Sequence, residues 1–256
     1  MALTNVALIG ANGHLGPSVL HILLSAPHLN ITVLTRASSA STYPSSVHTI
    51  TIPDSLPVQA LGDALCGQDA LVVTMAGNRV AEQIKLADAA YTAGVKRIIL
   101  ADFGSCDSAD EYTQALLPLM AGKAKREGST LSWTSIVTGH FFDYGLKGGL
   151  LRFDLPKRRA QLLDGGEMRW SACTLERIGV AVLRVLEREK ETRNRLLYVQ
   201  KLLCDRVIEE KREGLEKGDG DAIEEVVSRK EGFANVLLGL DEENLEDVVR
   251  RVIESM

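Results

Sequence analysis

The chain has 256 residues, of which 45% are hydrophobic and 25% charged, and this composition is typical of soluble globular proteins. A net charge of −5 gives no basic footprint for a nucleic acid, and no apolar run reaches the roughly 20 residues that a membrane-spanning helix needs. The four cysteines and five histidines are scattered without metal-ligand spacing, and the N-terminus lacks a basic signal segment, so we expect a cytoplasmic protein with reduced thiols and no metal site.

The first predicted elements are a strand, a glycine-rich turn and a helix. The apolar run 6–9 is typical of a strand buried on both faces, and apolar residues at helical spacing follow at 14–24. Between them, free backbone N–H groups and the helix dipole would point at a phosphate, although a bare turn is the alternative. The turn GANGHLG therefore predicts a dinucleotide site, with these contacts: Gly10, Asn12, Gly13, His14, Leu15 and Gly16.

The second predicted strand, Asn30–Leu34, ends in Thr35 and Arg36. Sites for NAD normally place an Asp or Glu about 20 residues beyond the glycines, where it binds the ribose hydroxyls. The first acidic residue of this chain is Asp54, and Arg36 stands near the position of the missing acid. A guanidinium there can bind a 2′-phosphate, so the pattern favours NADP(H) over NAD, with a solvated surface arginine as the alternative.

Strand and helix patterns continue to alternate, which predicts right-handed βαβ units. Further strands are expected at Val47–Ile52, Ala70–Ala76, Arg97–Ala101 and Thr130–Thr138, with a helix at Arg79–Ala93. The predicted fold class is therefore α/β, a Rossmann-type doubly wound parallel sheet. Ligands of such sheets bind at the carboxyl ends of the strands. This rule adds three candidate cofactor residues: Gly77, Phe103 and Gly139.

Several side chains near these strand ends are candidates for the nicotinamide pocket: Phe103, His140, Phe141 and Phe142. Of the histidines, His140 is the one we expect near enough to exchange protons there, although a purely structural histidine is the alternative. Asp102 ends the fifth strand, where it caps the following loop or orients a substrate.

Charge is unevenly distributed along the chain: residues 1–145 hold 19 charged side chains and residues 146–256 hold 44. This shift suggests an apolar α/β part followed by exposed helices. An apolar stripe at Leu175–Leu186 and an amphipathic segment at Asp241–Ile253 support helices, and Leu196–Val199 is a possible short strand. We expect an NADP-binding domain at 1–146 and a smaller, mainly helical domain at 147–256.

The chain resembles the NmrA-like and isoflavone-reductase-like family of atypical short-chain dehydrogenases, particularly its fungal oxidoreductase branch. The segments that carry the resemblance are GANGHLG, VLTR, AAYTAGVKRIILADFGS, LSWTSIVTGHFFDYGL and SACTLERIGVAVLRVL. The resemblance implies a Rossmann domain that binds NADPH and a smaller C-terminal substrate domain. It also implies reduction of small, often phenolic or polyketide-like metabolites, although other members bind the cofactor without turnover and act as redox-responsive regulators.

The predicted catalytic residue is a lysine. No tyrosine has a lysine four positions later, so the Tyr-x-x-x-Lys pair of ordinary short-chain dehydrogenases is absent. This leaves a lone lysine as acid and base, as the resemblance also implies, and Lys123 is the best positional match, with Lys125 second. Lys123 lies near the cofactor only if its helix begins late, with Pro118 as the first helical residue; otherwise it is a surface lysine.

Three functions remain open from the sequence. The first is an NADPH-dependent reductase of a small hydrophobic metabolite, the second a regulator that senses NADP(H) without turnover, and the third an inactive family member. The expected partners are a small-molecule substrate and, in addition, a second copy of the chain or a regulatory protein. Neither a nucleic acid nor a membrane is expected.

Overall fold

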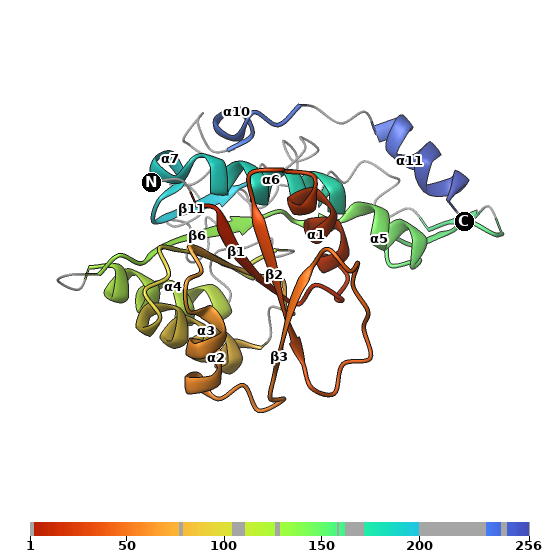
Figure 1. Cartoon of the computed structure of the whole chain (residues 1–256). Coiled ribbons are helices and arrows are strands. Elements are labelled where there is room, and N and C mark those ends of the chain that lie inside the picture. Colours follow the sequence, from red (N-terminus) through yellow and green to blue (C-terminus); the bar gives the residue numbers. More distant parts are fainter. Residues whose placement is uncertain are drawn as a thin grey trace.

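Seven parallel strands form the central sheet of the described part of the chain (Figure 1). In the order in which they lie side by side, they are β3 (His48–Ile52), β2 (Asn30–Arg36), β1 (Asn5–Ile9), β4 (Ala70–Val73), β5 (Arg97–Leu100), β6 (Ser132–Val137) and β11 (Arg195–Tyr198). The computed structural model describes residues 3–76, 79–103, 111–125, 129–157, 159–161, 172–199, 234–241 and 245–255. The first six strands have the order of a dinucleotide-binding Rossmann sheet, so the predicted fold class is confirmed.

Helices cover both faces of this sheet (Figure 1). One face carries α1 (Gly16–Leu24) and α6 (Leu175–Glu187), and the other carries α2 (Val58–Leu65), α3 (Val80–Thr92) and α4 (Glu111–Ala124). The smaller elements lie mostly in the C-terminal part: β7 (His140–Phe141), α5 (Phe142–Lys147), β8 (Phe153–Asp154), β9 (Arg159–Ala160), β10 (Ala172–Cys173), α7 (Glu189–Thr192), α10 (Asn235–Leu238) and α11 (Leu245–Glu254).

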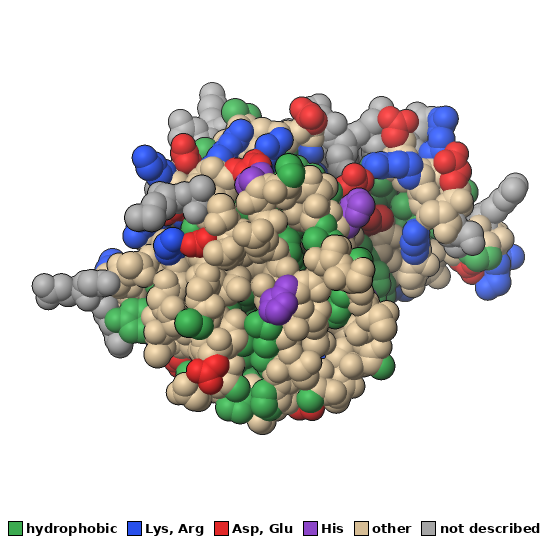
Figure 2. Space-filling view, viewed as in Figure 1, with side chains coloured by type: hydrophobic (Ala, Val, Ile, Leu, Met, Phe, Trp, Pro, Cys, Tyr) green, Lys and Arg blue, Asp and Glu red, His purple; other side chains and the backbone are tan. Residues whose placement is uncertain are grey.

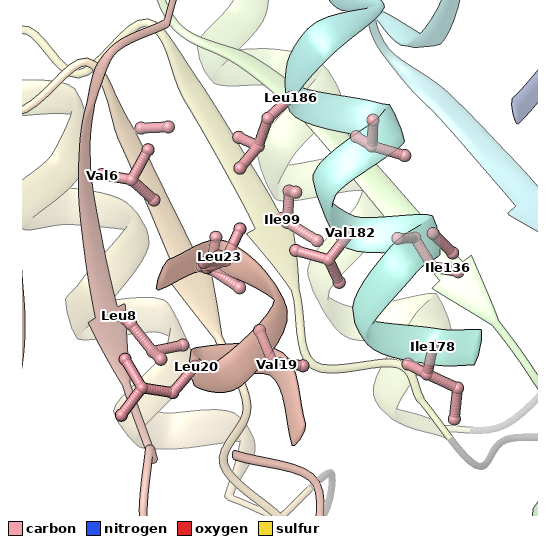
Figure 3. Packing of buried hydrophobic residues seen from close by; sticks show 14 of the residues in the cluster. Val6, Leu8, Val19, Leu20, Leu23, Ile99, Ile136, Ile178, Val182 and Leu186 are labelled. Carbon is pink, nitrogen blue, oxygen red and sulfur yellow. The ribbon is translucent and has the colours of Figure 1, made fainter. Parts of the chain in front are cut away.

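Successive side chains of a strand point to opposite faces of the sheet, so the core has two layers, one on each face. Val6 and Leu8 of β1 face α1 and α6, whereas Ala7 and Ile9 face the opposite helices. Figure 3 shows the first layer, in which side chains of β1, β5 and β6 meet two helical stripes: Val19, Leu20 and Leu23 from α1, and Ile178, Val182 and Leu186 from α6. Because both faces are covered, the central strands β1, β4 and β5 are mainly apolar runs, as the sequence predicted.

Most predicted elements are confirmed, with shifted ends. The fourth strand stops at Val73, earlier than predicted, and Thr74 donates its amide and its hydroxyl to the carbonyl of Ile9 instead. The sequence reading contained no helix at Val58–Leu65, where the structure has α2. That helix is short and carries Gly62 at its centre, so its helical signal is weak.

The segment after residue 146 contributes to the central sheet. β11 pairs with β6, from Arg195 beside Thr134 to Tyr198 beside Val137, and α6 packs against α1. The predicted division at 146/147 therefore does not separate the sheet from the rest of the chain. A separate substrate domain at 147–256 remains a prediction, since much of that segment lies outside the described residues.

The surface matches the uneven charge distribution of the sequence. In Figure 2, Lys, Arg, Asp and Glu side chains gather along the side formed by α6, α7, α10 and α11, and few appear over β2 and β3. Among the residues that the structure describes, no helix has both the length and the apolar character that crossing a membrane requires.

Candidate functional site

The loop between β1 and α1 requires glycine at its two ends. Gly10 has a φ of 90°, and a Cβ there would lie 2.8 Å from the carbonyl carbon of Thr74. At Gly16 a Cβ would lie 2.1 Å from the carbonyl oxygen of Gly10, closer than any side chain tolerates. Gly13 closes the turn by donating its amide to Gly10 O at 3.0 Å. The loop is therefore folded so tightly that its backbone, rather than side chains, is presented to a ligand.

A pocket of about 500 Å³ opens directly over this loop. Its lining comes from the carboxyl ends of several strands and the loops after them: Ile9, Gly10, Asn12, Gly13, His14, Leu15, Leu34, Thr35, Arg36, Ser39, Leu56, Thr74, Met75, Ala76, Arg79, Phe103 and Phe141. The lining thus extends from β2 across β1, β4 and β5 to the end of β6, four strand spacings or about 19 Å. An elongated ligand such as a dinucleotide fits this span.

Arg36, the last residue of β2, forms the polar end of the pocket. It is exposed, and the loop after it is tied to the glycine loop because the Asn12 amide donates to the hydroxyls of Ser39, at 3.3 Å, and Ser41, at 2.8 Å. Asp54, the first acid of the sequence, accepts the Ser38 hydroxyl at 2.5 Å. None of the described residues that line the pocket is acidic, and such a surrounding suits an anion.

The opposite end of the pocket is apolar. Met75 and Ala76 follow β4, Phe103 follows β5, and Phe141 lies in β7 just after β6. Of the other residues predicted near these strand ends, Gly139 is buried with a φ of 66° and does not line the pocket. Gly77 lies outside the described residues. The pocket lining thus includes seven of the predicted cofactor residues, whereas Gly16, Lys123 and Gly139 are not among the lining residues.

Among the described residues, the histidine of the pocket is His14, so the prediction that His140 is the one placed there is wrong. His140 is exposed on β7 and does not line the pocket. His14 does line it, and its Nε2 lies 3.1 Å from the hydroxyl of Tyr144 on α5. The two rings are in contact, with centroids 4.2 Å apart and planes inclined at 36°. The phenol of Tyr144 was not among the predicted site residues.

Lys123 lies outside the pocket. The late helix start on which its catalytic role depended is wrong, because α4 begins at Glu111 and Pro118 lies inside it. Lys123 is buried near the C-terminal end of α4, where its Nζ lies 2.5 Å from Asp88 Oδ1 and 5.3 Å from the ring centre of Tyr91. Both partners belong to the second half of α3, which begins at the pocket and runs away from it. The structure therefore gives Lys123 an ion-pairing partner and no access to the pocket.

Lys125, the second choice, is exposed just after α4 and is not among the pocket residues. Asp102 is buried at the end of β5 and accepts the Ser135 hydroxyl at 2.7 Å. Within the described parts of the chain, no group of three or more potential metal-ligating side chains lies together.

One pocket residue that the sequence reading missed is Arg79. It precedes α3, and its guanidinium is bound to the Glu82 carboxylate at 2.8 Å, so its charge is already compensated. Met75 and Leu56 were missed as well, since apolar residues at strand ends and in loops give no local signal.

Comparisons with known proteins show the family of the chain. A family model for NAD(P)H-binding proteins matches residues 10–153. An oxidoreductase of Aspergillus flavus, named aprR, is 32% identical over 202 residues, which cover 76% of this chain and 67% of that protein. The chain spans about two thirds of the length of the curated relatives that it matches.

Solved structures share the fold. Isoflavone reductase superposes with a TM-score of 0.64 over 97% of this chain and 90% of its own, at 15% identity. The complex of leucoanthocyanidin reductase with NADPH from Vitis vinifera superposes with a TM-score of 0.59 over 82% of this chain and 75% of its own, at 16% identity. At these identities, the likeness supports the fold.

Proposed function

The chain belongs to the NAD(P)H-binding family, among the NmrA-like and isoflavone-reductase-like atypical short-chain dehydrogenases, and we propose that it is an NADPH-dependent reductase of a small hydrophobic metabolite. Its curated relatives are oxidoreductases. The proposal covers the preference for NADPH, the reduction and the type of substrate.

The observation that carries the proposal is the tight loop Gly10–Gly16, here called the glycine cradle, together with Arg36 at one end of the pocket above it. In this proposal the backbone of Gly10–Gly16 holds the diphosphate, where the helix N-terminus of α1 adds a partial positive charge. Arg36 and the hydroxyl of Ser39 hold the 2′-phosphate, and Asn12 keeps the serine loop in place. No acid lines this part of the described pocket to repel a second phosphate.

The apolar end of the pocket is the proposed place of the nicotinamide and the substrate. When bound, NADPH supplies a hydride. Phe103, Phe141 and Met75 exclude water from that end and favour a flat, apolar substrate, such as a phenolic or polyketide-like compound. The complex of leucoanthocyanidin reductase with NADPH has the same fold as this chain, and this shared fold supports the proposal that NADPH binds here.

Calorimetry with NADPH and NADH, followed by an assay of NADPH oxidation, tests the proposal. The probes are an enone, a quinone and an aryl ketone. We expect tighter binding of NADPH than of NADH and turnover of at least one probe. Equal affinity for both nucleotides would refute the NADPH preference, and binding without turnover of any probe would favour the cofactor-sensing regulator. The position of Lys123, away from the pocket, is the observation that keeps this second function open.

A further inference from the structure

His14 and Tyr144 connect the glycine loop to the C-terminal part of the chain at the apolar end of the pocket. His14 belongs to the loop after β1, whereas Tyr144 belongs to α5, which follows β7 directly. The contact brings the imidazole toward the side of the pocket where Phe141 lies, three residues before Tyr144. Arg36 and Ser39 occupy the other end, so His14 belongs to the proposed diphosphate cradle while its side chain contacts α5, next to the proposed place of the substrate.

We propose, on the basis of the proposed reductase function, that His14 donates the proton that completes reduction and that Tyr144 positions its ring. Histidine is the side chain that exchanges protons in the neutral pH range. His14 is exposed to solvent and also lines the pocket, so it can be protonated again after each turnover. Lys123, the predicted donor, is buried in its ion pair with Asp88.

The hydrogen bond between His14 and Tyr144 determines which ring nitrogen is free to donate a proton to the substrate. Tyr144 Oη lies next to Nε2, and no described residue bonds Nδ1. In the imidazolium, Nε2–H donates to the phenol oxygen, and Nδ1–H is left to face a substrate. Loss of the Nδ1 proton then gives the neutral tautomer in which Nε2–H donates to the phenol oxygen. Tyr144 is therefore a positioning residue, because it acts through His14.

The proposed reduction transfers a hydride and a proton to the substrate. A hydride from NADPH forms a C–H bond at the carbonyl carbon of the substrate, and the π electrons of the C=O bond move to the oxygen. That oxygen takes the Nδ1 proton of His14, so NADPH becomes NADP⁺ and the ketone becomes an alcohol. Solvent returns a proton to His14. The co-reactant is the NADPH of the proposed function.

Charged neighbours do not complicate this assignment. From α5, Tyr144 faces the ring, and the adjacent Asp143 is turned toward α6, where its carboxylate accepts the Leu175 amide at 3.1 Å. The charged side chains of the pocket are Arg36 and Arg79, and Arg79 is paired with Glu82. Within the described residues, no acid forms an ion pair with His14.

The test compares His14→Gln and Tyr144→Phe with His21→Gln, a matched change at an exposed histidine of α1 outside the pocket. Turnover of the best probe is measured at saturating NADPH across the neutral pH range. For the wild type and the His21→Gln variant, we expect kcat to fall as the pH rises, because the donor loses its proton. His14→Gln should lower kcat by about 10²–10⁴-fold and flatten this profile, and Tyr144→Phe should lower it about tenfold.

A second measurement needs no turnover. Nitrogen NMR of histidine-labelled protein reports the tautomer of His14, which we expect to be Nε2–H in the wild type and a mixture in Tyr144→Phe, whose ring keeps the stacking but lacks the hydroxyl. An Nδ1–H tautomer in the wild type would overturn the assignment, as would an unchanged pH profile in His14→Gln. Wild-type protein that binds NADPH but reduces no probe would overturn the reductase function and the donor together. Turnover that survives His14→Gln would overturn the donor alone.

Discussion

Lys123 and Asp88 form an ion pair between α4 and α3, with Nζ 2.5 Å from Oδ1. The lysine side chain is only 7% exposed, whereas the carboxylate is 43% exposed, so the two partners differ in what they lose when the other is removed. A buried ammonium without a counter-charge is costly, but a carboxylate near solvent is readily hydrated. The pair therefore stabilises the helix contact because it neutralises the lysine.

This asymmetry predicts that Asp88→Asn destabilises the protein more than Lys123→Met. We expect Asp88→Asn to lower the free energy of unfolding by about 1–2 kcal/mol after allowance for solvent screening. Lys123→Met keeps the apolar stem and removes the charge, so its cost should be under about 1 kcal/mol. Urea unfolding at pH 7 measures both. If a folded Lys123→Met variant still binds NADPH but no longer oxidises it, Lys123 has a catalytic role after all.

Gly16→Ala should abolish nucleotide binding, because its Cβ would meet the Gly10 carbonyl oxygen at 2.1 Å and force the loop to open. Gly62→Ala is the matched control, since Gly62 lies within α2 and a Cβ there meets nothing within 4 Å. The control should stabilise the protein by about 0.5–1 kcal/mol. Calorimetry with NADPH and thermal unfolding distinguish the two variants. A Gly16→Ala variant with wild-type affinity would contradict the role of the cradle.

Arg36→Ala should weaken NADPH binding much more than NADH binding. A charge-assisted bond to the 2′-phosphate is worth about 1.5–3 kcal/mol, which corresponds to about a 10–150-fold loss of NADPH affinity. Arg251→Ala serves as the control, because Arg251 pairs with Glu176 at 3.3 Å on the exposed side of α11. Titrations of each variant with both nucleotides measure the difference. Equal weakening of NADPH and NADH would remove the basis for the proposed preference.

The lowered pKa of Asp69 predicts how the free energy of unfolding changes in acid. Burial alone would raise the pKa of its carboxyl, but the Asn5 amide at 2.9 Å, the Lys96 ammonium at 2.6 Å and the Thr4 amide and hydroxyl together lower this pKa to about 2. A lowered pKa stabilises the folded state above the unfolded value of about 4, and the contribution disappears as the pH falls from about 4 to 2.

Asp69→Asn should therefore lower the free energy of unfolding at pH 7 by about 2 kcal/mol and have almost no effect near pH 2. Urea titrations of the wild type and the variant across this range give the pH at which the difference vanishes. A constant difference at every pH would show that the hydrogen bonds, rather than the charge, provide the stabilisation.

Sequence reasoning predicted the sheet and the cofactor end of the site because both depend on local patterns. Apolar runs such as Val6–Ile9 identify strands that are buried on two sides, and the spacing of Gly10, Gly13 and Gly16 has a direct steric cause. The position of Arg36 in the pocket could be predicted because ligands of such sheets bind at the carboxyl ends of the strands, and Arg36 ends β2.

The apolar end of the pocket was harder to predict, because it depends on how side chains are oriented in three dimensions. Lys123 was chosen by its position along the chain, but the side of α4 on which it emerges faces α3. His140 is a candidate because it follows β6, with a structural histidine as the alternative, and the structure leaves it exposed on β7 outside the pocket. The bond from His14 to Tyr144 joins residues 130 positions apart, and no local pattern reports such a contact.

The position of β11 has a practical consequence for protein engineering. Leu197 of this last strand is almost fully buried, and α6 contributes Ile178, Val182 and Val185 to the interior shared with α1. A fragment that stops at residue 146 would expose that apolar surface and an unpaired edge of β6, both of which promote aggregation. A self-contained nucleotide-binding unit therefore cannot end at residue 146. To transfer the glycine cradle to another protein, β11 and α6 must be transferred with it.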